Sequence, residues 1–333
     1  MYNLYIMNNV VKQIEKLYSI NVSEFLEIKE GNTNKNFSLI SDDKKFFLKC
    51  YSNTDPERVK LIHHVACAFT EQDIPVLMPL ENIHDNTVLI VEGTPYALFP
   101  MIDHDHLDRG DLTDSQIVTC AKSLASLHRA GEQVSHKYLR SFDGWDKQES
   151  LALIQDLSRE LRENRENDPV DAVVFEYLKG IEKRIAYHDI SYDPQRLSKP
   201  IVIHGDFHSE NLLFKEDNVQ AIIDFETVMY APREYELLLS SIGTFAYGSI
   251  NKNAIKNMRL YIQSYLKEYP IDQATYLYAC DVYAHFFLHS TWSLERRYSD
   301  KDISAIENVL INIERQKFLD ENLNVLKEMW IET

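Results

Sequence analysis

The stretch from residue 201 to residue 226 constrains the fold most, because it places charged side chains between short apolar strands. It begins IVIHGDFHSENLLF and, after a polar turn, ends AIIDFE. The apolar runs IVI, LLF and AII predict buried strands. Buried polar groups must be hydrogen-bonded or bind a ligand. The pattern therefore predicts a polar site where these strands end.

The spacing within this stretch indicates a chemistry. Asp206 and Asn211 are five positions apart, the interval between aspartate and asparagine in the kinase loop H-R-D-x-x-x-x-N. A positioned carboxylate can accept the proton of an attacking hydroxyl. Carboxylate and amide oxygens are ligands that Mg²⁺ prefers. We therefore predict Asp206 as the catalytic base, and Asn211 and Asp224 as magnesium ligands.

The first hundred residues alternate like a small antiparallel sheet. Asp55 and Pro56 mark the start of one helix, because aspartate caps free amides and proline suits the first helical position. We expect that helix to end near Gln72 and an earlier helix to cover residues 9–18. The expected strands are 37–40, 45–51, 87–93 and 95–102.

Beyond Asp108 the pattern becomes mostly helical. Residues 113–129 carry apolar side chains at a spacing that makes one buried stripe. The strands around residues 201–226 are the interruptions that we expect in this otherwise helical half of the chain. We predict an α+β chain with a small N-terminal antiparallel sheet lobe, residues 1–101, and a larger mostly helical lobe, residues 102–333.

HGDFHSENLLF followed by IIDFE resembles the aminoglycoside phosphotransferase and choline kinase family of small-molecule kinases. The loop of that family reads H-G-D-x-x-x-x-N and its metal strand reads I-D-[FW]-E. EGNTNKNFSLI at 30–40 resembles its nucleotide loop, and LASLH at 124–128 resembles a later helix. The resemblance covers nearly the whole chain and implies a protein-kinase-like two-lobe fold.

The resemblance also implies a nucleotide site. Lys49 would contact the phosphates, and the strand alternation of KFFLKCY places it on the face opposite Phe46, Leu48 and Cys50. The glycine of the nucleotide loop allows its backbone to approach the phosphates closely. The connector between the lobes would contact the rest of the nucleotide. The implied nucleotide-binding residues are Lys49, Gly31, Asn32, Thr33, Asn34, Pro100, Met101 and Ile102.

One feature departs from the family pattern. A kinase strand lysine normally pairs with a glutamate in the middle of the next helix, and that region here reads KLIHHVACAF. Glu57, near the start of the helix, is a candidate partner for Lys49. Glu226 is a candidate for contact with the acceptor or for an ion pair. His208 is a candidate for ordering the loop or contacting the substrate.

Composition narrows the classes of partner. Thirty-five basic and fifty-two acidic residues leave a net charge of −17, which disfavours binding to a phosphate backbone. An acidic protein can attract cationic small molecules. No apolar run approaches the length of a membrane span, and the N-terminus lacks the pattern of an export signal. We expect a cytoplasmic protein with no nucleic-acid or membrane partner, and the oligomeric state stays open.

Together these features predict an enzyme that uses Mg²⁺ and ATP, or GTP, to phosphorylate a hydroxyl of a small molecule. An aminoglycoside-like antibiotic or another cationic metabolite is the expected acceptor. Choline, ethanolamine and homoserine are alternatives. A nucleotide-binding regulatory protein with weak catalysis is the alternative from another class, because the helix after Lys49 lacks the central glutamate.

Overall fold

The computed structural model describes residues 4–28, 35–51, 54–163, 169–188, 190–247 and 252–332. Its contacts divide the chain into two compact units. The first comprises Met1–His106, Arg129–Leu139 and Asn211–Val228, and the second comprises Leu107–His128, Arg140–Glu210 and Met229–Thr333. The lobe boundary expected after residue 101 stays a prediction.

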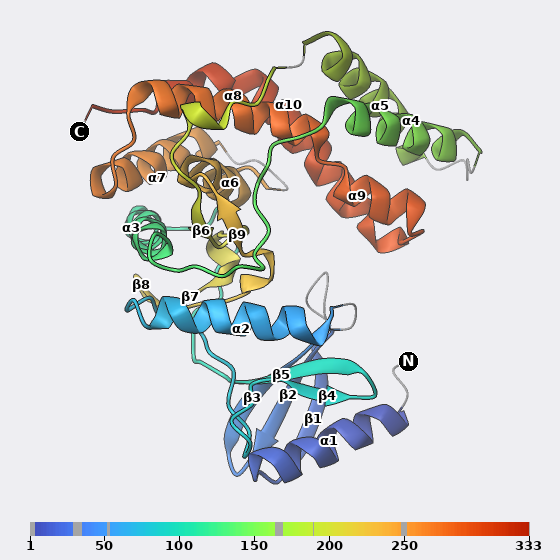
Figure 1. Cartoon of the computed structure of the whole chain (residues 1–333), viewed down its shortest axis with the longest axis vertical. Coiled ribbons are helices and arrows are strands. Elements are labelled where there is room, and N and C mark those ends of the chain that lie inside the picture. The colour runs from blue at the N-terminus through green and yellow to red at the C-terminus, as the bar shows by residue number, and fades with distance from the viewer. Residues whose placement is uncertain are drawn as a thin grey trace. The chain divides into compact units, whose positions relative to one another are not determined.

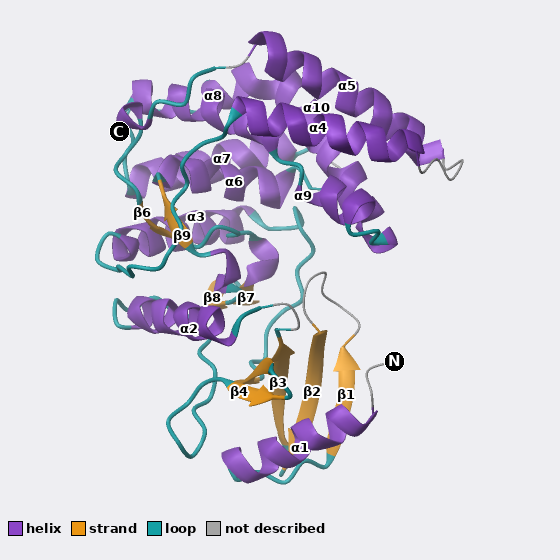
Figure 2. Ribbon diagram, turned by 45° about the vertical axis from the view of Figure 1, so that its right-hand side comes forward, coloured by secondary structure: helices purple, strands orange, loops and turns teal. Residues whose placement is uncertain are grey.

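An antiparallel sheet of five strands forms the core of the first unit (Figures 1 and 2). Two aspartates with positive φ, Asp42 at 48° and Asp43 at 63°, form the turn between its second and third strands. Such a two-residue turn suits the twist of a hairpin. The strand order is β1-β2-β3-β5-β4. The strands are β1 (Glu24–Ile28), β2 (Lys35–Ser41), β3 (Lys44–Cys50), β4 (Leu89–Val91) and β5 (Thr94–Pro100).

Two helices complete the N-terminal part of this unit. Helix α1 (Leu4–Tyr18) packs Val10 and Ile14 into the apolar core of the sheet. Helix α2 (Pro56–Thr70) begins as predicted, because the Asp55 side chain accepts a hydrogen bond from the Glu57 N–H at 2.9 Å. It ends two residues earlier than expected.

A two-stranded hairpin, β7 (Leu212–Lys215) and β8 (Asn218–Ile222), belongs to the same unit. The Ile222 N–H donates to the Pro75 carbonyl at 2.7 Å, and the Ile222 carbonyl accepts from the Leu77 N–H at 3.0 Å. The Asp105 N–H donates to the Phe214 carbonyl at 2.7 Å. Backbone segments far apart in sequence therefore hold this hairpin in place.

The second unit is mostly helical, with one short strand pair, β6 (Ile201–Ile203) and β9 (Met229–Ala231) (Figure 2). Its helices α4, α5, α8 and α10 contribute to one apolar cluster that includes Leu157, Leu178, Leu288 and Val309. The helices are α3 (Asp114–Gly131), whose last residues belong to the first unit, α4 (Lys147–Glu163), α5 (Pro169–His188), α6 (Arg233–Phe245), α7 (Ala254–Glu268), α8 (Gln273–His289), α9 (Trp292–Leu294) and α10 (Ile306–Lys327).

The predicted order of a small antiparallel sheet followed by helices is confirmed. Phe46, Leu48 and Cys50 are buried on one face of β3, as the alternation predicted. Strand β1 was not predicted, because its sequence EFLEI alternates weakly and Leu26 is 61% exposed. Within the described ranges, no helix is both long and apolar enough to cross a bilayer.

Candidate active site

Asn211 and Asp224 lie at the same end of the β7–β8 hairpin. Leu212 pairs with Ile222, and the Ile223 N–H donates to the Asn211 carbonyl at 3.0 Å. Asn211 is buried, whereas the Asp224 side chain is 40% exposed. The hairpin thus brings an amide and a carboxylate together, and both supply the oxygen ligands that suit Mg²⁺. The donor chemistry present therefore fits this ion.

The backbone of Asp224 adopts the left-handed conformation, with φ 66° and ψ 58°. Residues other than glycine seldom adopt it, and aspartate and asparagine tolerate it best. A short 3₁₀ helix, η3 (Phe225–Thr227), follows immediately. Its Phe225 is buried and lies 5.6 Å from Phe69 of α2, measured between ring centres. The packing of Phe225 against Phe69 therefore helps to maintain the strained conformation that positions the carboxylate.

Lys49 of β3 meets the same hairpin end. Its Nζ lies 3.1 Å from Oδ1 of Asp224 and also pairs with Glu226, within the first unit. Burial would lower the pKa of Lys49, but the charges of Asp224 and Glu226 outweigh burial and raise it above the ordinary value. The ammonium group is therefore charged, and it lies directly beside the carboxylate expected to bind magnesium.

Glu57 does not reach Lys49 in this structure. Its carboxylate is 76% exposed and pairs with Lys60 on the same helix at 2.7 Å. Glu226 takes the place beside Lys49 instead, so the ion-pair partner comes from the hairpin end and not from α2. The ion pair considered for Glu226 is thus formed with Lys49.

Asp206 lies in the loop after β6, in the second unit, and its side chain is 48% exposed. Its Oδ2 is 3.5 Å from Nε2 of the buried His208. Burial would raise the pKa of Asp206, but the hydrogen bond and charge of His208, with the charges of His204 and Arg109, lower it to about 2. The carboxylate is therefore ionised at neutral pH.

Arg109 fixes His208 and the end of this loop. Its Nη2 lies 2.9 Å from Nε2 of His208, its Nε donates to Glu210 at 2.6 Å, and its Nη1 donates to the Gly243 carbonyl at 3.3 Å. Burial and the nearby guanidinium lower the pKa of His208, although Asp206 opposes that shift. The guanidinium therefore fixes both the ring of His208 and the end of the loop.

Glu236 fixes the start of the loop. This fully buried carboxylate of α6 accepts the His204 N–H at 3.1 Å and the Gly205 N–H, and it lies 2.9 Å from Nε2 of His128. The other ring nitrogen of His128 lies 2.7 Å from the Tyr265 hydroxyl. Two consecutive backbone donors therefore share one carboxylate immediately before Asp206.

The remaining nucleotide-site predictions lie in two places. Gly31, Asn32, Thr33 and Asn34 fall outside the described residues. In the first unit, Pro100 ends β5 opposite Phe46, the Met101 N–H donates to the Lys45 carbonyl at 3.1 Å, and Ile102 follows. These residues stay predictions as nucleotide contacts.

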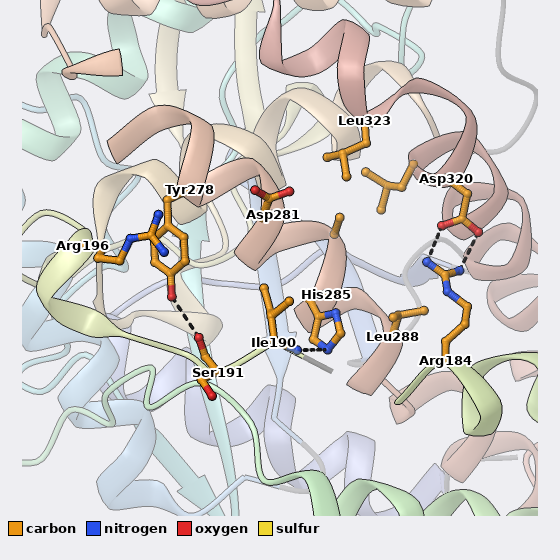
Figure 3. A pocket seen from close by; sticks show the side chains of 12 residues that line it. Arg184, Ile190, Ser191, Arg196, Tyr278, Asp281, His285, Leu288, Asp320 and Leu323 are labelled. Carbon is orange, nitrogen blue, oxygen red and sulfur yellow. Dashed lines mark hydrogen bonds and ion pairs between the residues drawn. The ribbon is translucent and has the colours of Figure 1, made fainter. Parts of the chain in front are cut away.

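A cavity of about 820 Å³ lies elsewhere in the second unit, among α8, α10 and residues 190–196 (Figure 3). None of the predicted site residues that the structure describes lines it. Its arginines already have partners: Arg184 binds Asp320 at 2.6 and 2.7 Å, and the Arg196 guanidinium lies 3.7 Å from the ring centre of Tyr278. The cavity is therefore separate from the loop that carries Asp206.

Glu236, His128 and Arg109 were not among the predicted site residues. A signal existed for Glu236, because an acid inside the apolar run EYELLL is rarely buried without a partner. His128 ends LASLH, where the family resemblance had marked the helix but not this side chain. Arg109 lies in a charged stretch that offered no sign of its partner.

Comparison with known proteins agrees with the geometry. Residues 24–250 match the model of the phosphotransferase enzyme family. A homoserine kinase of Bartonella henselae is 27% identical over 225 residues, which cover 65% of this chain and 64% of the relative. The chain thus spans less than two thirds of that relative's length.

Two solved structures share the fold. A spectinomycin phosphotransferase, solved with ADP and spectinomycin, has a TM-score of 0.68 at 16% identity and covers 97% of this chain and 98% of its own. An amicoumacin kinase, solved with AMP-PNP and Ca²⁺, has a TM-score of 0.65 at 14% identity over 94% and 93%. The predicted fold class and family resemblance are confirmed: this chain belongs to the phosphotransferase enzyme family.

Proposed function

We propose that this protein transfers the γ-phosphoryl group of a nucleoside triphosphate to a hydroxyl of a small molecule. The main support is the arrangement of the motif. Asp206 is ionised and lies just after two anchored backbone amides, and Asn211 and Asp224 share one hairpin end. The family match over residues 24–250 supports the same chemistry.

In the proposed reaction, Asp206 accepts a hydrogen bond from the acceptor hydroxyl and takes its proton. The hydroxyl oxygen forms a bond to the γ-phosphorus as the bond from that phosphorus to the bridging oxygen breaks, and the nucleoside diphosphate leaves. Lys49 contacts the phosphates with its ammonium group. Asn211 and Asp224 would hold Mg²⁺, which neutralises charge on the phosphates when bound.

ATP or GTP is the proposed donor and Mg²⁺ the proposed metal. ADP or AMP-PNP accompanies the two structural neighbours, and Ca²⁺ accompanies one of them. The proposed compartment is the cytoplasm, where nucleoside triphosphates are abundant.

The acceptor is proposed to be a small-molecule alcohol, and the comparisons favour different ones. The structural neighbours include antibiotic kinases, which agrees with the expected aminoglycoside-like acceptor. The sequence relative is a homoserine kinase, an acceptor kept as an alternative. The regulatory alternative loses part of its motivation, because Glu226 supplies the carboxylate beside Lys49 that α2 lacks.

An Asp206→Asn variant tests the proposal. Asparagine has nearly the same shape but cannot take the proton, so turnover should fall roughly 100- to 10,000-fold. Nucleotide affinity should stay unchanged. Diphosphate release and the mass of the product, measured for alcohols, amino alcohols, hydroxy acids and antibiotics, give the readout. A variant as active as the wild type would refute the assignment of Asp206 as the base.

A further inference from the structure

Arg315 is a buried guanidinium near the catalytic loop. This residue of α10 is 9% exposed, and its Nε has no hydrogen-bond partner. No carboxylate of the described residues lies within ion-pair distance of it. Its guanidinium carbon lies 5.8 Å from the ring centre of Tyr247 and 5.2 Å from that of Phe287. Aromatic rings offset part of the cost of burying this charge, and the described residues supply no negative partner for it.

The position of Gly243 connects Arg315 with the loop. A side-chain carbon on this residue of α6 would lie 3.9 Å from Cβ of His208 and 4.0 Å from Nη2 of Arg315. His208 is two residues after Asp206 and 3.5 Å from it. Gly243 therefore lies between the Arg315 guanidinium and the loop that carries the proposed base.

Arg315 belongs to a polar face of α10. Asn308, Asn312 and Arg315 follow one another at spacings of four and three, so they share one side of the helix, and all three are buried. The Tyr247 hydroxyl donates to Asn308 at 3.3 Å, and Asn312 donates to Ser293 at 2.9 Å. A helix that served packing alone would present apolar side chains here.

Arg109, unlike Arg315, has an acidic partner among the described residues. Its carbon lies 3.8 Å from the ring centre of Tyr247, the same ring that Arg315 approaches. Arg109 nevertheless donates to Glu210, so its charge is balanced inside the protein. Among the described residues Arg315 has no acidic partner of this kind, although it is buried.

We propose that Arg315 binds a carboxylate of the acceptor, so that the substrate is a hydroxy acid or an amino acid with a hydroxyl group. This proposal rests on the proposed phosphotransfer, because it places the acceptor beside Asp206. A guanidinium matches the planar, singly charged carboxylate. A group with two negative charges would need a second cation, and Glu210 already balances Arg109.

The charge of Arg315 favours a different kind of acceptor from the one that the net charge of the chain favours. A net charge of −17 favours cationic acceptors at long range. Close to the loop, Arg315 would repel the ammonium groups of an aminoglycoside and attract an acid. The charge at the contact determines discrimination, because desolvated charges interact much more strongly than screened ones.

Matched acceptors test the proposal directly. Homoserine and 3-aminopropan-1-ol differ by the carboxylate alone, 4-hydroxybutyrate lacks the amine instead, and kanamycin is polycationic. Wild-type kcat/KM should be higher for homoserine than for 3-aminopropan-1-ol. Arg315→Met should reduce that ratio about 10- to 100-fold, mainly through KM, the range expected when a hydrogen bond to a charged group is lost. Arg315→Lys should restore part of it.

Two controls separate recognition from damage to the fold. Arg184→Met removes a guanidinium that pairs with Asp320 at the cavity of Figure 3, and it should leave the ratio unchanged. Nucleotide affinity should be equal in the wild type and in Arg315→Met. Preference for kanamycin or 3-aminopropan-1-ol over both acids, or a ratio that Arg315→Met leaves unchanged, would overturn the carboxylate site and leave the phosphotransfer standing.

Binding measurements distinguish this outcome from failure of the proposed function. Homoserine and 4-hydroxybutyrate can be titrated calorimetrically into Asp206→Asn, with and without the Arg315→Met change. Binding that depends on Arg315, together with wild-type protein that phosphorylates no acceptor, would support the carboxylate site and refute the phosphotransfer. Equal or absent binding of both acids in the two proteins would overturn the carboxylate site.

Discussion

Replacing Glu236 with glutamine should both destabilise the second unit and slow the reaction. One carboxylate oxygen accepts the His204 N–H and lies beside His128, and the other accepts the Gly205 N–H. Glutamine keeps one acceptor oxygen and places an NH₂ group where the second oxygen was. At least one buried N–H donor then faces another donor.

The size of the effect follows from these contacts. A hydrogen bond to a charged group contributes about 1.5–3 kcal/mol, and a buried donor left without a partner adds its own cost. Because the three donors share one carboxylate, their contributions do not simply add, and we expect a loss of about 2–4 kcal/mol in the free energy of unfolding. A loop displaced by about 1 Å should also lower kcat roughly 10- to 100-fold.

Urea unfolding followed by tryptophan fluorescence measures the first effect. All three tryptophans, Trp145, Trp292 and Trp330, lie in the second unit with Glu236. Glu234→Gln is the matched control, because Glu234 is equally buried on the same helix but accepts from Ser198 instead of the loop. It should lose stability and keep its turnover. Equal losses of turnover in both variants, or none in Glu236→Gln, would refute the role of Glu236 in positioning the loop.

Three further predictions follow from the first unit. Asp224→Asn should keep the left-handed backbone and weaken nucleotide binding about tenfold or more in the presence of Mg²⁺. Without Mg²⁺ the nucleotide affinity should change little. Equal affinities of the wild type and the variant in a calorimetric titration with Mg²⁺ would refute the metal assignment. Glu57→Gln should change the free energy of unfolding by less than about 0.5 kcal/mol and leave nucleotide affinity unaltered, because the Glu57 carboxylate is exposed and pairs with Lys60. A loss of nucleotide affinity as large as that of Glu226→Gln would show that Glu57 reaches Lys49 in solution. Burial and the charge of Lys49 lower the pKa of His63 from 6.5 to about 4, so the unfolded chain takes up the proton first and stability falls as the pH drops between these values, by up to about 3 kcal/mol. Urea unfolding at several pH values should show this decline in the wild type and a flatter curve in His63→Gln; identical slopes would contradict the assignment.

Much of the secondary structure could be predicted, because its signals are local. The alternation in β3 and the cap of α2 each involve residues within a few positions of one another. Strand β1 was not predicted, because the exposed Leu26 breaks the pattern of a half-buried strand. Pairing with β2 makes this segment a strand, and pairing is a tertiary contact.

The proximity of Asn211 and Asp224 was equally accessible from sequence. The strands beside these two residues form one hairpin, so short-range spacing brings the two side chains to the same end of it. Their roles and that of Asp206 stay predictions. The partner of Lys49 was not accessible, because the carboxylates beside it are supplied by residues roughly half the chain away. The family pattern suggested the helix after Lys49, and the structure supplied the hairpin end instead.

The sequence by itself determined the residue types and spacing of the motif, the order of sheet and helices, and the face of β3 that carries Lys49. The tertiary structure alone decided which charges meet. Lys49 and Asp224 are 175 positions apart, His128 and Glu236 are 108 apart, and Arg315 approaches the loop through Gly243 of another helix. No local pattern encodes such pairs, because each depends on how separate helices and strands pack, and packing also decides which buried charge is left for a ligand.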